Sequence, residues 1–330
     1  MNHPHASKTL SQSDIALQIE YLVEALEHSD GPVQSLTTNG TVKRTKLTRY
    51  VENIGQMLEL VSHSDDYHYG PYLRLFQQAC YDVGVEHSLL AGIISFDEAT
   101  SQYRDYSDTL NRLVDRIRQL TRERIYRRRR DDARYQERQQ SREVAEYVDQ
   151  VLDRYATTLV IRVDLYYRSA AQARLRVEHV FADLHRLIRS RERNPIFEHE
   201  TGYICRVEQG ERRGYHIHAA FFFNGAMVRG DIYKAQQIGA LWEQITRGKG
   251  SYHNCNQDKA QYGDECGIGM IHRRDEPARD NVLQAMSYLV KRFQRLSLRP
   301  KGAKSLRSVR RGRKASSICS GGCVCCGTST

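Results

Sequence analysis

The chain has 330 residues, of which 40% are hydrophobic and 27% are charged. This composition can bury a core, and it excludes a fibrous or wholly disordered protein. No run of apolar residues approaches the roughly 18 to 20 that a membrane-spanning helix needs, which excludes an integral membrane protein. The polar N-terminus lacks the apolar segment of a secretory signal, and we therefore expect a cytoplasmic protein.

Positive charge is concentrated at the C-terminal end. The formal net charge is +10, and residues 299–330 contain eight Lys or Arg and no acid, which leaves +2 for the remainder (10 − 8 = 2). We predict that 299–330 is a disordered basic tail that contacts a polyanion such as nucleic acid. A solvated tail that only improves solubility is the alternative.

The eight cysteines offer two weak candidates for zinc sites. Without a secretion signal, a disulfide framework is not expected. Four cysteines crowd the tail but lack the paired spacing of zinc modules (Cys319, Cys323, Cys325 and Cys326). A second possible set lies upstream (His253, Cys255, Cys266 and His272). We favour free cysteines over both sets.

The first half of the chain has helical periodicity. Residues 1–12 are predicted to be disordered, and 13–155 to form a helical N-terminal region. Apolar residues recur at helical spacing in three segments (14–28, 47–62 and about 71–83). A long, highly charged helix over about 106–154 either protrudes or links this region to the second half of the chain. Its arginine run at 127–130 either contacts phosphates or forms a solvated face.

Strand patterns begin after residue 155. Residues 157–167 alternate apolar and polar side chains, which predicts a strand. The expected elements after it are a helix, two strands joined by a turn at 209–214, a helix, a short strand and a final helix (170–189, 203–208, 215–223, 231–246, 268–272 and 281–295). This order is typical of the α+β, split βαβ or ferredoxin-like plan, with an antiparallel sheet. We assign it to one domain over 156–298.

Two histidines of the central strand are candidate metal ligands. His216 and His218 are two residues apart, so a strand directs both to one face. In a chain with 13 histidines such a pair is a weak signal by itself. Glu208 ends the preceding strand, and a hairpin would bring it beside the histidines if the register allows. Two imidazoles and a carboxylate suit Mg²⁺ or Mn²⁺, but they also suit a zinc hydrolase.

A candidate nucleophile lies on the last predicted helix. Tyr288 and Lys291 are three residues apart and therefore share one side. The alternative is an ordinary helix with a polar outer face. A phenol with its usual pKa of about 10 is a weak nucleophile, and a nearby cation and lysine make it useful by stabilising the phenolate.

These three features in this order carry a family resemblance. The strand 157–167, the E-x7-H-x-H pattern of Glu208, His216 and His218, and the Y-x-x-K pattern resemble the HUH endonucleases of rolling-circle replication. More narrowly, residues 157–295 resemble the inovirus gene-2-product family of replication initiators. That family is also described as YagK/YfjJ-like and occurs in filamentous phages and prophages.

The resemblance implies a role for each residue of these patterns. His216, His218 and Glu208 would hold Mg²⁺ or Mn²⁺ on the scissile phosphate of single-stranded origin DNA. Tyr288 would attack the phosphorus, which gives a 5′-phosphotyrosine intermediate and a free 3′-OH, and Lys291 would position the phosphate or stabilise the tyrosine.

Further residues are assigned around this chemistry. Some phage initiators use two tyrosines on one helix, but position 292 is Arg, which indicates a single-tyrosine enzyme. Asp164 and Arg162 could face the site or form an ion pair on the sheet surface. Our candidates for DNA contact are three arginines (Arg162, Arg292 and Arg295). Tyr166 and Tyr167 are further candidates, for which a purely structural role is the alternative.

The sequence has no P-loop motif, so we expect a host helicase and a host polymerase as partners, in the cytoplasm of a bacterial host cell. The alternative function is a non-catalytic DNA- or RNA-binding phage or prophage regulator on the same fold. A zinc hydrolase without a covalent tyrosine intermediate is a third hypothesis.

Overall fold

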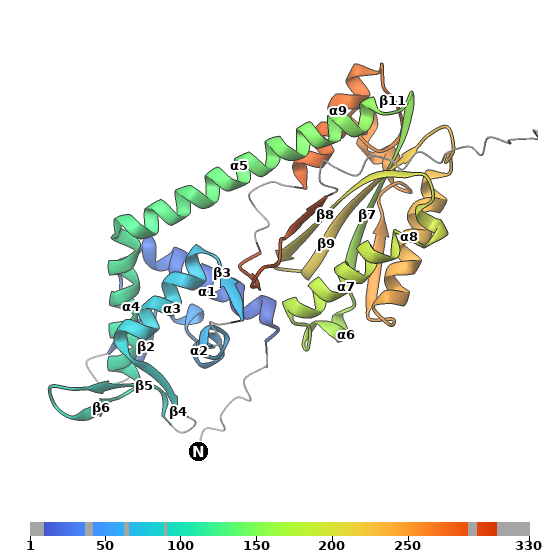
Figure 1. Cartoon of the computed structure of the whole chain (residues 1–330). Coiled ribbons are helices and arrows are strands. Elements are labelled where there is room, and N and C mark those ends of the chain that lie inside the picture. The colour runs from blue at the N-terminus through green and yellow to red at the C-terminus, as the bar shows by residue number, and fades with distance from the viewer. Residues whose placement is uncertain (1–9, 37–41, 63–65, 89–90, 290–295, 309–330) are drawn as a thin grey trace, which may run out of the picture.

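The computed structural model describes residues 10–36, 42–62, 66–88, 91–289 and 296–308. N-terminal helices are followed by a mixed α+β part built on a six-stranded antiparallel sheet (Figure 1). Within the described residues, no helix is long and apolar enough to cross a membrane.

The N-terminal part consists of helices and small antiparallel sheets. Its helices are α1 (Gln12–Glu27), α2 (Ile54–Ser62), α3 (Pro71–Val83) and α4 (Tyr106–Arg122). Its short strands are β1 (Gln34–Leu36) with β2 (Val42–Arg44), and β4 (Val85–Ser88) with β5 (Gly92–Asp97) and β6 (Gln102–Arg104). The prediction for 71–83 is confirmed, whereas the segment 47–62 is a short 3-10 turn followed by α2.

The long charged segment forms two helices. The backbone of Glu123 is extended and separates α4 from α5 (Arg124–Asp153). Tyr126 near the start of α5 is buried among the N-terminal helices, while Val144, Val148 and Val151 pack against the sheet. The helix therefore links the two parts, as one of the two sequence-based alternatives expects (Figure 1).

The central sheet has the order β10-β7-β9-β8-β13, and β11 pairs with the other end of β7. Its strands are β7 (Thr157–Tyr167), β8 (Glu200–Gly210), β9 (Gly214–Asn224), β10 (Gly250–Asn254), β11 (Gly269–His272) and β13 (Leu306–Ser308). The strand predicted at 157–167 is confirmed. Sequence reasoning missed β10, because the short polar segment Gly-Ser-Tyr-His-Asn has no apolar alternation.

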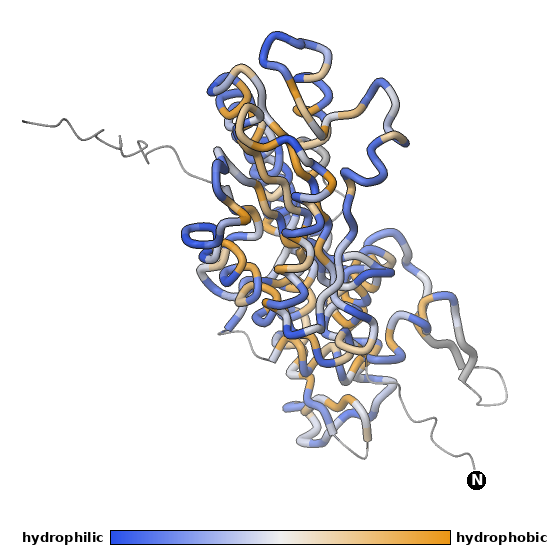
Figure 2. Tube along the Cα trace, turned by 90° about the vertical axis from the view of Figure 1, so that its right-hand side faces the viewer, coloured by the Kyte–Doolittle hydropathy of each residue, from blue (hydrophilic) through white to orange (hydrophobic). Residues whose placement is uncertain are grey.

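Helices cover both faces of this sheet. The short α6 (Ser169–Gln172), α7 (Val177–Ser190) and α8 (Asp231–Ile245) lie on one face, where they bury Trp242, Phe221 and Phe223. The C-terminal half of α5 and α9 (Glu276–Tyr288) lie on the other face, against Val160, Phe222 and Ile204. Figure 2 shows apolar segments inside both the helical part and the sheet part.

The described end of the chain is paired rather than free. Strand β12 (Leu298–Pro300) pairs with β3 (Tyr67–Tyr69) of the N-terminal part, and β13 pairs with β8. Residues 299–308, which the sequence assigns to a disordered tail, therefore hold strand structure. The rest of the predicted tail, 309–330, lies outside the described residues, as do residues 1–9.

Gly202 on β8 lies where α5 crosses the sheet, and it provides a test of that packing. A Cβ at this position would overlap the Tyr147 hydroxyl and come within 3.1 Å of Val151 Cγ2. We predict that Gly202→Ala lowers the free energy of unfolding by about 1–3 kcal/mol, because overpacking pushes the helix away. Urea denaturation measures this change.

Gly31→Ala is the matched control, since a Cβ there meets its nearest atom, Ser29 Oγ, at an ordinary 3.6 Å. Equal stability of the Gly202→Ala variant and the wild type would contradict the close docking of α5 on the sheet.

Candidate metal centre

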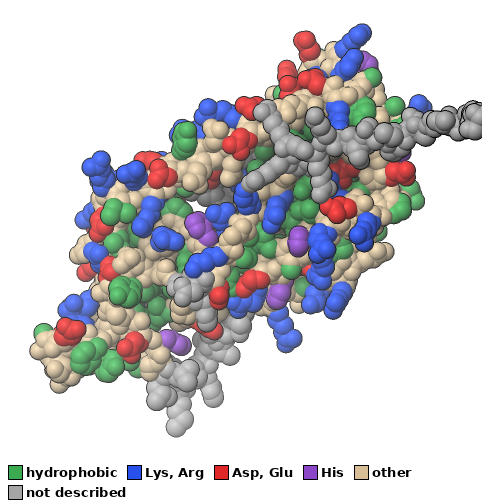
Figure 3. Space-filling model, viewed as in Figure 1, with side chains coloured by type: hydrophobic (Ala, Val, Ile, Leu, Met, Phe, Trp, Pro, Cys, Tyr) green, Lys and Arg blue, Asp and Glu red, His purple; other side chains and the backbone are tan. Residues whose placement is uncertain are grey.

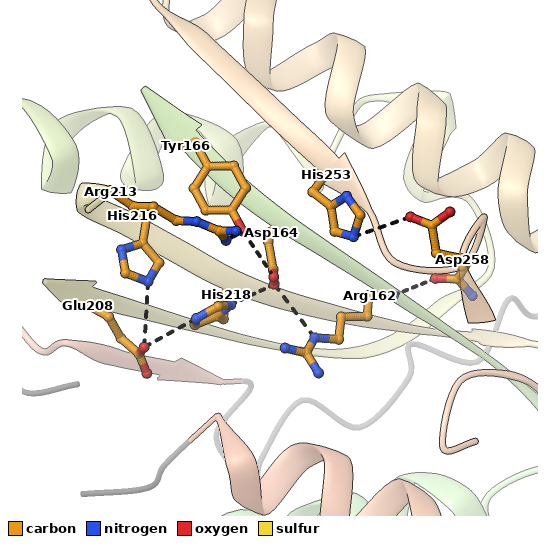
Figure 4. A network of polar contacts seen from close by, with 10 residues as sticks. Arg162, Asp164, Tyr166, Glu208, Arg213, His216, His218, His253 and Asp258 are labelled. Atoms are coloured by element: carbon orange, nitrogen blue, oxygen red, sulfur yellow. Dashed lines mark hydrogen bonds and ion pairs between the residues drawn. The ribbon is translucent and has the colours of Figure 1, made fainter. Parts of the chain in front are cut away.

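The register of the β8–β9 hairpin brings the predicted metal ligands together. Glu208 is directly opposite His216, so its carboxylate shares the face of His216 and His218. On the same face, His218 has Arg206 on one side and Asp164 of β7 on the other. We call this side of the sheet the histidine face (Figure 4).

The three ligand side chains meet at a buried point. His218 Nε2 lies 3.2 Å from Glu208 Oε2, and His216 Nε2 lies 3.8 Å from the same oxygen. One ligand atom from each residue lies within 4.8 Å of the other two. Glu208 is fully buried, and the histidines are 3% and 5% exposed.

These atoms fit a divalent cation. Both Glu208 carboxylate oxygens and His218 Nε2 are buried in ion pairs with one another, with His216 and with Arg206, without a well-aligned hydrogen bond among the described residues. Such atoms are costly unless an ion or a donor satisfies them. Ligands of one ion stand about 3 to 4 Å apart, so a small contraction would allow all three to reach it. Glu208, His216 and His218 could therefore hold Mg²⁺ or Mn²⁺, or zinc.

A second layer of groups orients the two imidazoles. His218 Nδ1 donates a hydrogen bond of 2.6 Å to Asp164 Oδ1, and His216 Nδ1 donates one of 3.0 Å to the carbonyl oxygen of Gly214. Each contact occupies Nδ1 and leaves Nε2 facing Glu208. Metal-bound histidines in proteins are held in this way.

Two buried guanidinium groups flank the carboxylates. Arg206 Nε lies 3.3 Å from Glu208 Oε1, and Arg162 Nε lies 3.6 Å from Asp164 Oδ1. The ion pair between Arg162 and Asp164 that the sequence allows is therefore present, and it lies on the histidine face. Each guanidinium offsets the cost of burying a carboxylate beside the candidate centre.

The pKa values of the polar groups depend on one another. Burial opposes ionisation of Asp164, but the hydrogen bond from His218 and the charges of His218 and Arg162 outweigh it and lower the pKa of Asp164 to about 2. Burial would lower the pKa of His218, but Asp164 and Glu208 raise it to about 9. Burial and the charge of His218 lower the pKa of His216. Without metal, His218 therefore carries the proton at neutral pH.

Tyr166 and Arg213 are close to the centre; the sequence analysis names Tyr166 only as a candidate for DNA contact, and it missed Arg213. The Tyr166 ring lies 5.9 Å from that of His216, and its hydroxyl donates a hydrogen bond of 3.2 Å to Asp164. The Arg213 guanidinium stacks 4.7 Å from the Tyr166 ring centroid. Arg206 was missed as well. The alternation that found the histidines also applies to Tyr166 and Arg206, but their place beside the centre depends on the register between strands.

The predicted nucleophile is described in part. Tyr288 is the last residue of α9, and its side chain lies outside the described part of the structure, as do Lys291, Arg292 and Arg295. Helix α9 starts at Glu276, five residues before the predicted start (281 − 276 = 5), because Asp275 caps it and proline follows in its first turn.

The alternative zinc set is not assembled. Within the described residues, only Glu208, His216 and His218 form a group that could share an ion. His253 instead pairs with Asp258 at 3.5 Å, and Cys255 is buried. The four tail cysteines lie outside the described residues.

Comparison with known protein families adds one finding. The family described as the YagK/YfjJ C-terminal domain matches residues 118–297, which is more than half of the chain. The chain belongs to this family. No curated protein and no solved structure matches it. The YagK/YfjJ match includes α5, which the sequence analysis assigns to the N-terminal region.

Metal binding at the centre of this YagK/YfjJ domain should compete with a proton. Because the pKa of His218 is raised to about 9 without metal, an ion must displace its proton at lower pH. We predict that Mn²⁺ affinity rises by about tenfold per pH unit from pH 7 until it levels off near the pKa of His218. Calorimetric titration measures this dependence, and His216→Ala should abolish the binding. An affinity that does not change with pH would contradict the assignment.

Asp164→Asn tests the orienting role of the second layer. Loss of such a partner weakens metal affinity by about 10- to 100-fold. The substitution also removes the charge that raises the pKa of His218, so affinity should level off at lower pH. The matched control is Asp183→Asn, since Asp183 is also buried and accepts a hydrogen bond from Tyr167, but on the opposite face. An equal loss of Mn²⁺ affinity in the two variants would contradict a specific role for Asp164.

Proposed function

We propose that the chain is a rolling-circle replication initiator of the HUH endonuclease superfamily, which nicks single-stranded origin DNA through Tyr288. The observation that carries this proposal is the buried group of Glu208, His216 and His218, whose ligand atoms all lie within 4.8 Å of one another. Membership of the YagK/YfjJ family supports it, since the sequence resemblance links that family to replication initiators.

The position of α9 supports Tyr288 as the nucleophile. Met286 and Leu289, on either side of it in sequence, are buried against the sheet in the same cluster as Ala220 and Phe222 of β9. Those two residues follow His218 on the histidine face, because alternate residues of a strand share a face. The backbone of Tyr288 therefore belongs to a helix that packs on the face where the chemistry is required.

The charge of the centre supports a phosphate as the group bound there. The formal charges of Arg162, Arg206, Asp164 and Glu208 cancel one another. With neutral imidazoles, a bound divalent cation would leave the centre positive. Such a centre favours an anionic substrate oxygen. Arg162 would then balance charge at the centre, in addition to its proposed direct contact with DNA.

In the proposed reaction the Tyr288 oxygen forms a bond to the scissile phosphorus while the bond from phosphorus to the 3′ oxygen breaks. The phenol loses its proton, and the departing 3′ oxygen gains one. Mg²⁺ or Mn²⁺ held by Glu208, His216 and His218 would supply stabilisation of the growing negative charge on the phosphate. Lys291 positions the phosphate or stabilises the phenolate. The tyrosyl ester retains the energy of the broken bond, so the enzyme can later rejoin ends.

The fold offers further support. We propose a ferredoxin-like, split βαβ domain with β11 and β13 as additions. The antiparallel order β10-β7-β9-β8, with α7 and α8 on one face, supports this proposal. A host helicase and a host polymerase would supply unwinding and extension in a bacterial cytoplasm, since the sequence has no P-loop motif.

The test is a covalent adduct on Tyr288. A pool of single-stranded oligonucleotides labelled at the 3′ end should label the protein in the presence of Mn²⁺. The piece of DNA on the 3′ side of the nick carries the label, and its 5′ phosphate stays bonded to the tyrosine. A chelator and His216→Ala should each prevent labelling. Tyr288→Phe should reduce it by at least about 10³-fold.

Tyr166→Phe is the matched control, because Tyr166 is the described tyrosine next to His216. Burial and Asp164 raise the pKa of its phenol, which makes it a poor nucleophile, and we expect labelling to persist. Labelling that is lost in Tyr166→Phe and kept in Tyr288→Phe would overturn the proposal. Tight binding without cleavage would favour the non-catalytic regulator, and cleavage without an adduct would favour a hydrolase.

A further inference from the structure

A basic cavity lies on the opposite face of the sheet from the candidate metal centre. It has a volume of about 680 Å³ and lies between α6 with the loop after it, α7, and the end of α8 with the loop after it. This volume is within the range of cavities that enclose a small organic ligand. Its apolar lining includes side chains from all three elements (Ala171, Leu175, Ala182 and Ile245).

The rim of this cavity carries an excess of positive charge. Its lining includes five Lys or Arg side chains and one acid, Asp183 (the cations are Arg168, Arg174, Arg186, Arg247 and Lys249). Arg186 pairs with Asp183, and Arg168 pairs with Glu243 outside the lining at 2.8 Å. The excess of positive charge therefore comes from the other three cations, Arg174, Arg247 and Lys249, which are exposed. Figure 3 shows Lys and Arg side chains gathered over α6 and α7.

The loop that forms one wall has an uncommon backbone. Arg247 has a φ of 54°, and Gly248 follows with a φ of 77°. A left-handed conformation costs energy for a residue other than glycine. The conformation holds Arg247 and Lys249 at the mouth, while the hydroxyl of Thr246 accepts a hydrogen bond of 2.8 Å from the backbone N–H of Gly250.

The cavity and the metal centre lie at the same end of the sheet. Tyr166 and Tyr167 are consecutive on β7, so Tyr166 lies beside His216 while Tyr167 lines the cavity on the other face. The backbone N–H of Arg168 donates to the carbonyl of Lys249, and the Gln172 amide donates to the carbonyl of Arg213 at 3.0 Å. These bonds fix α6 and the cavity wall to the strand ends around the centre.

We propose that this cavity binds a nucleotide of the single strand whose scissile phosphate lies at the metal centre, with the base on the apolar floor and its phosphate at the basic rim. This inference rests on the proposed function for the identity of the strand. The strand would pass around the end of the sheet beside Arg213, whose guanidinium is already stacked on Tyr166. Nucleic-acid sites combine cations along the backbone with surfaces for bases in this manner.

Two variants test separately the charge of the cavity rim and the shape of the cavity. Arg247→Glu combined with Lys249→Glu should weaken binding of a short fluorescent single strand of mixed sequence by at least about tenfold. Ala171→Trp fills the cavity without changing charge, and it should weaken the same binding by about fivefold or more. Ala171→Trp should not weaken binding of a matching strand that lacks bases.

Arg189→Glu combined with Arg193→Glu is the matched control, because both arginines are exposed towards the other end of α7 and do not line the cavity. We expect the affinity of this control variant for the fluorescent single strand to change by less than about twofold. An equal loss of affinity in the control and in the rim variant (Arg247→Glu with Lys249→Glu) would overturn the inference. Unchanged affinity in Ala171→Trp would overturn it as well.

Fluorescence anisotropy measures this binding. A chelator in the buffer removes the metal ion that cleavage needs, so binding is measured independently of cleavage. If the Tyr288 adduct forms while the cavity variants bind normally, the cavity inference is wrong and the proposed function stands. If no adduct forms while the rim variant and Ala171→Trp lose binding as expected, the proposed function fails and the cavity remains a nucleic-acid site.

Discussion

The register between β8 and β9 is the constraint on which the candidate site depends. It places Glu208 opposite His216 and Arg206 opposite His218, so that carboxylate, imidazoles and guanidinium share one face. A slip of one residue would turn Glu208 towards α7 and bring Val207 to the histidines. The large apolar residues of the same strands oppose such a slip, because Phe221 and Phe222 are fully buried on opposite faces. The core thus defines the geometry of the polar centre.

The polar centre in turn costs stability. Glu208 and His218 are buried against each other, and the ion pairs of Arg206 with Glu208 and of Arg162 with Asp164 are buried on the same face. Buried ion pairs contribute little net stability, since desolvation offsets their attraction. Sites that retain such groups are often functional, because selection maintains them against this cost. The raised pKa of His218 and the lowered pKa of Asp164 show that the two charged groups stabilise each other against this cost, and a bound cation would take the place of the His218 proton.

Sequence reasoning located the centre because alternation along a strand is a local property. It was enough to place His216 and His218 on one side, and the short turn after Glu208 suggested its position. It could not find Arg206 as a neighbour of His218, because cross-strand pairing joins residues distant in the chain. For the same reason it missed β10, whose residues have no strand pattern of their own and pair with β7 through backbone hydrogen bonds. The cavity beside α6 depends on three elements together and leaves no local signal.

Helix α5 lies before the predicted domain boundary at residue 155, and its C-terminal half packs on the sheet that follows that boundary. Its charge and low apolar content suggested a separate segment, yet Val148 and Leu152 complete the core under the histidine face. The same core holds Met286 and Leu289, which position α9 and with it the backbone of Tyr288. A domain cut at residue 155 would expose this core and remove the support of the helix that carries the proposed nucleophile. The YagK/YfjJ match begins at residue 118, before α5, which agrees with a domain that needs this helix to cover its histidine face.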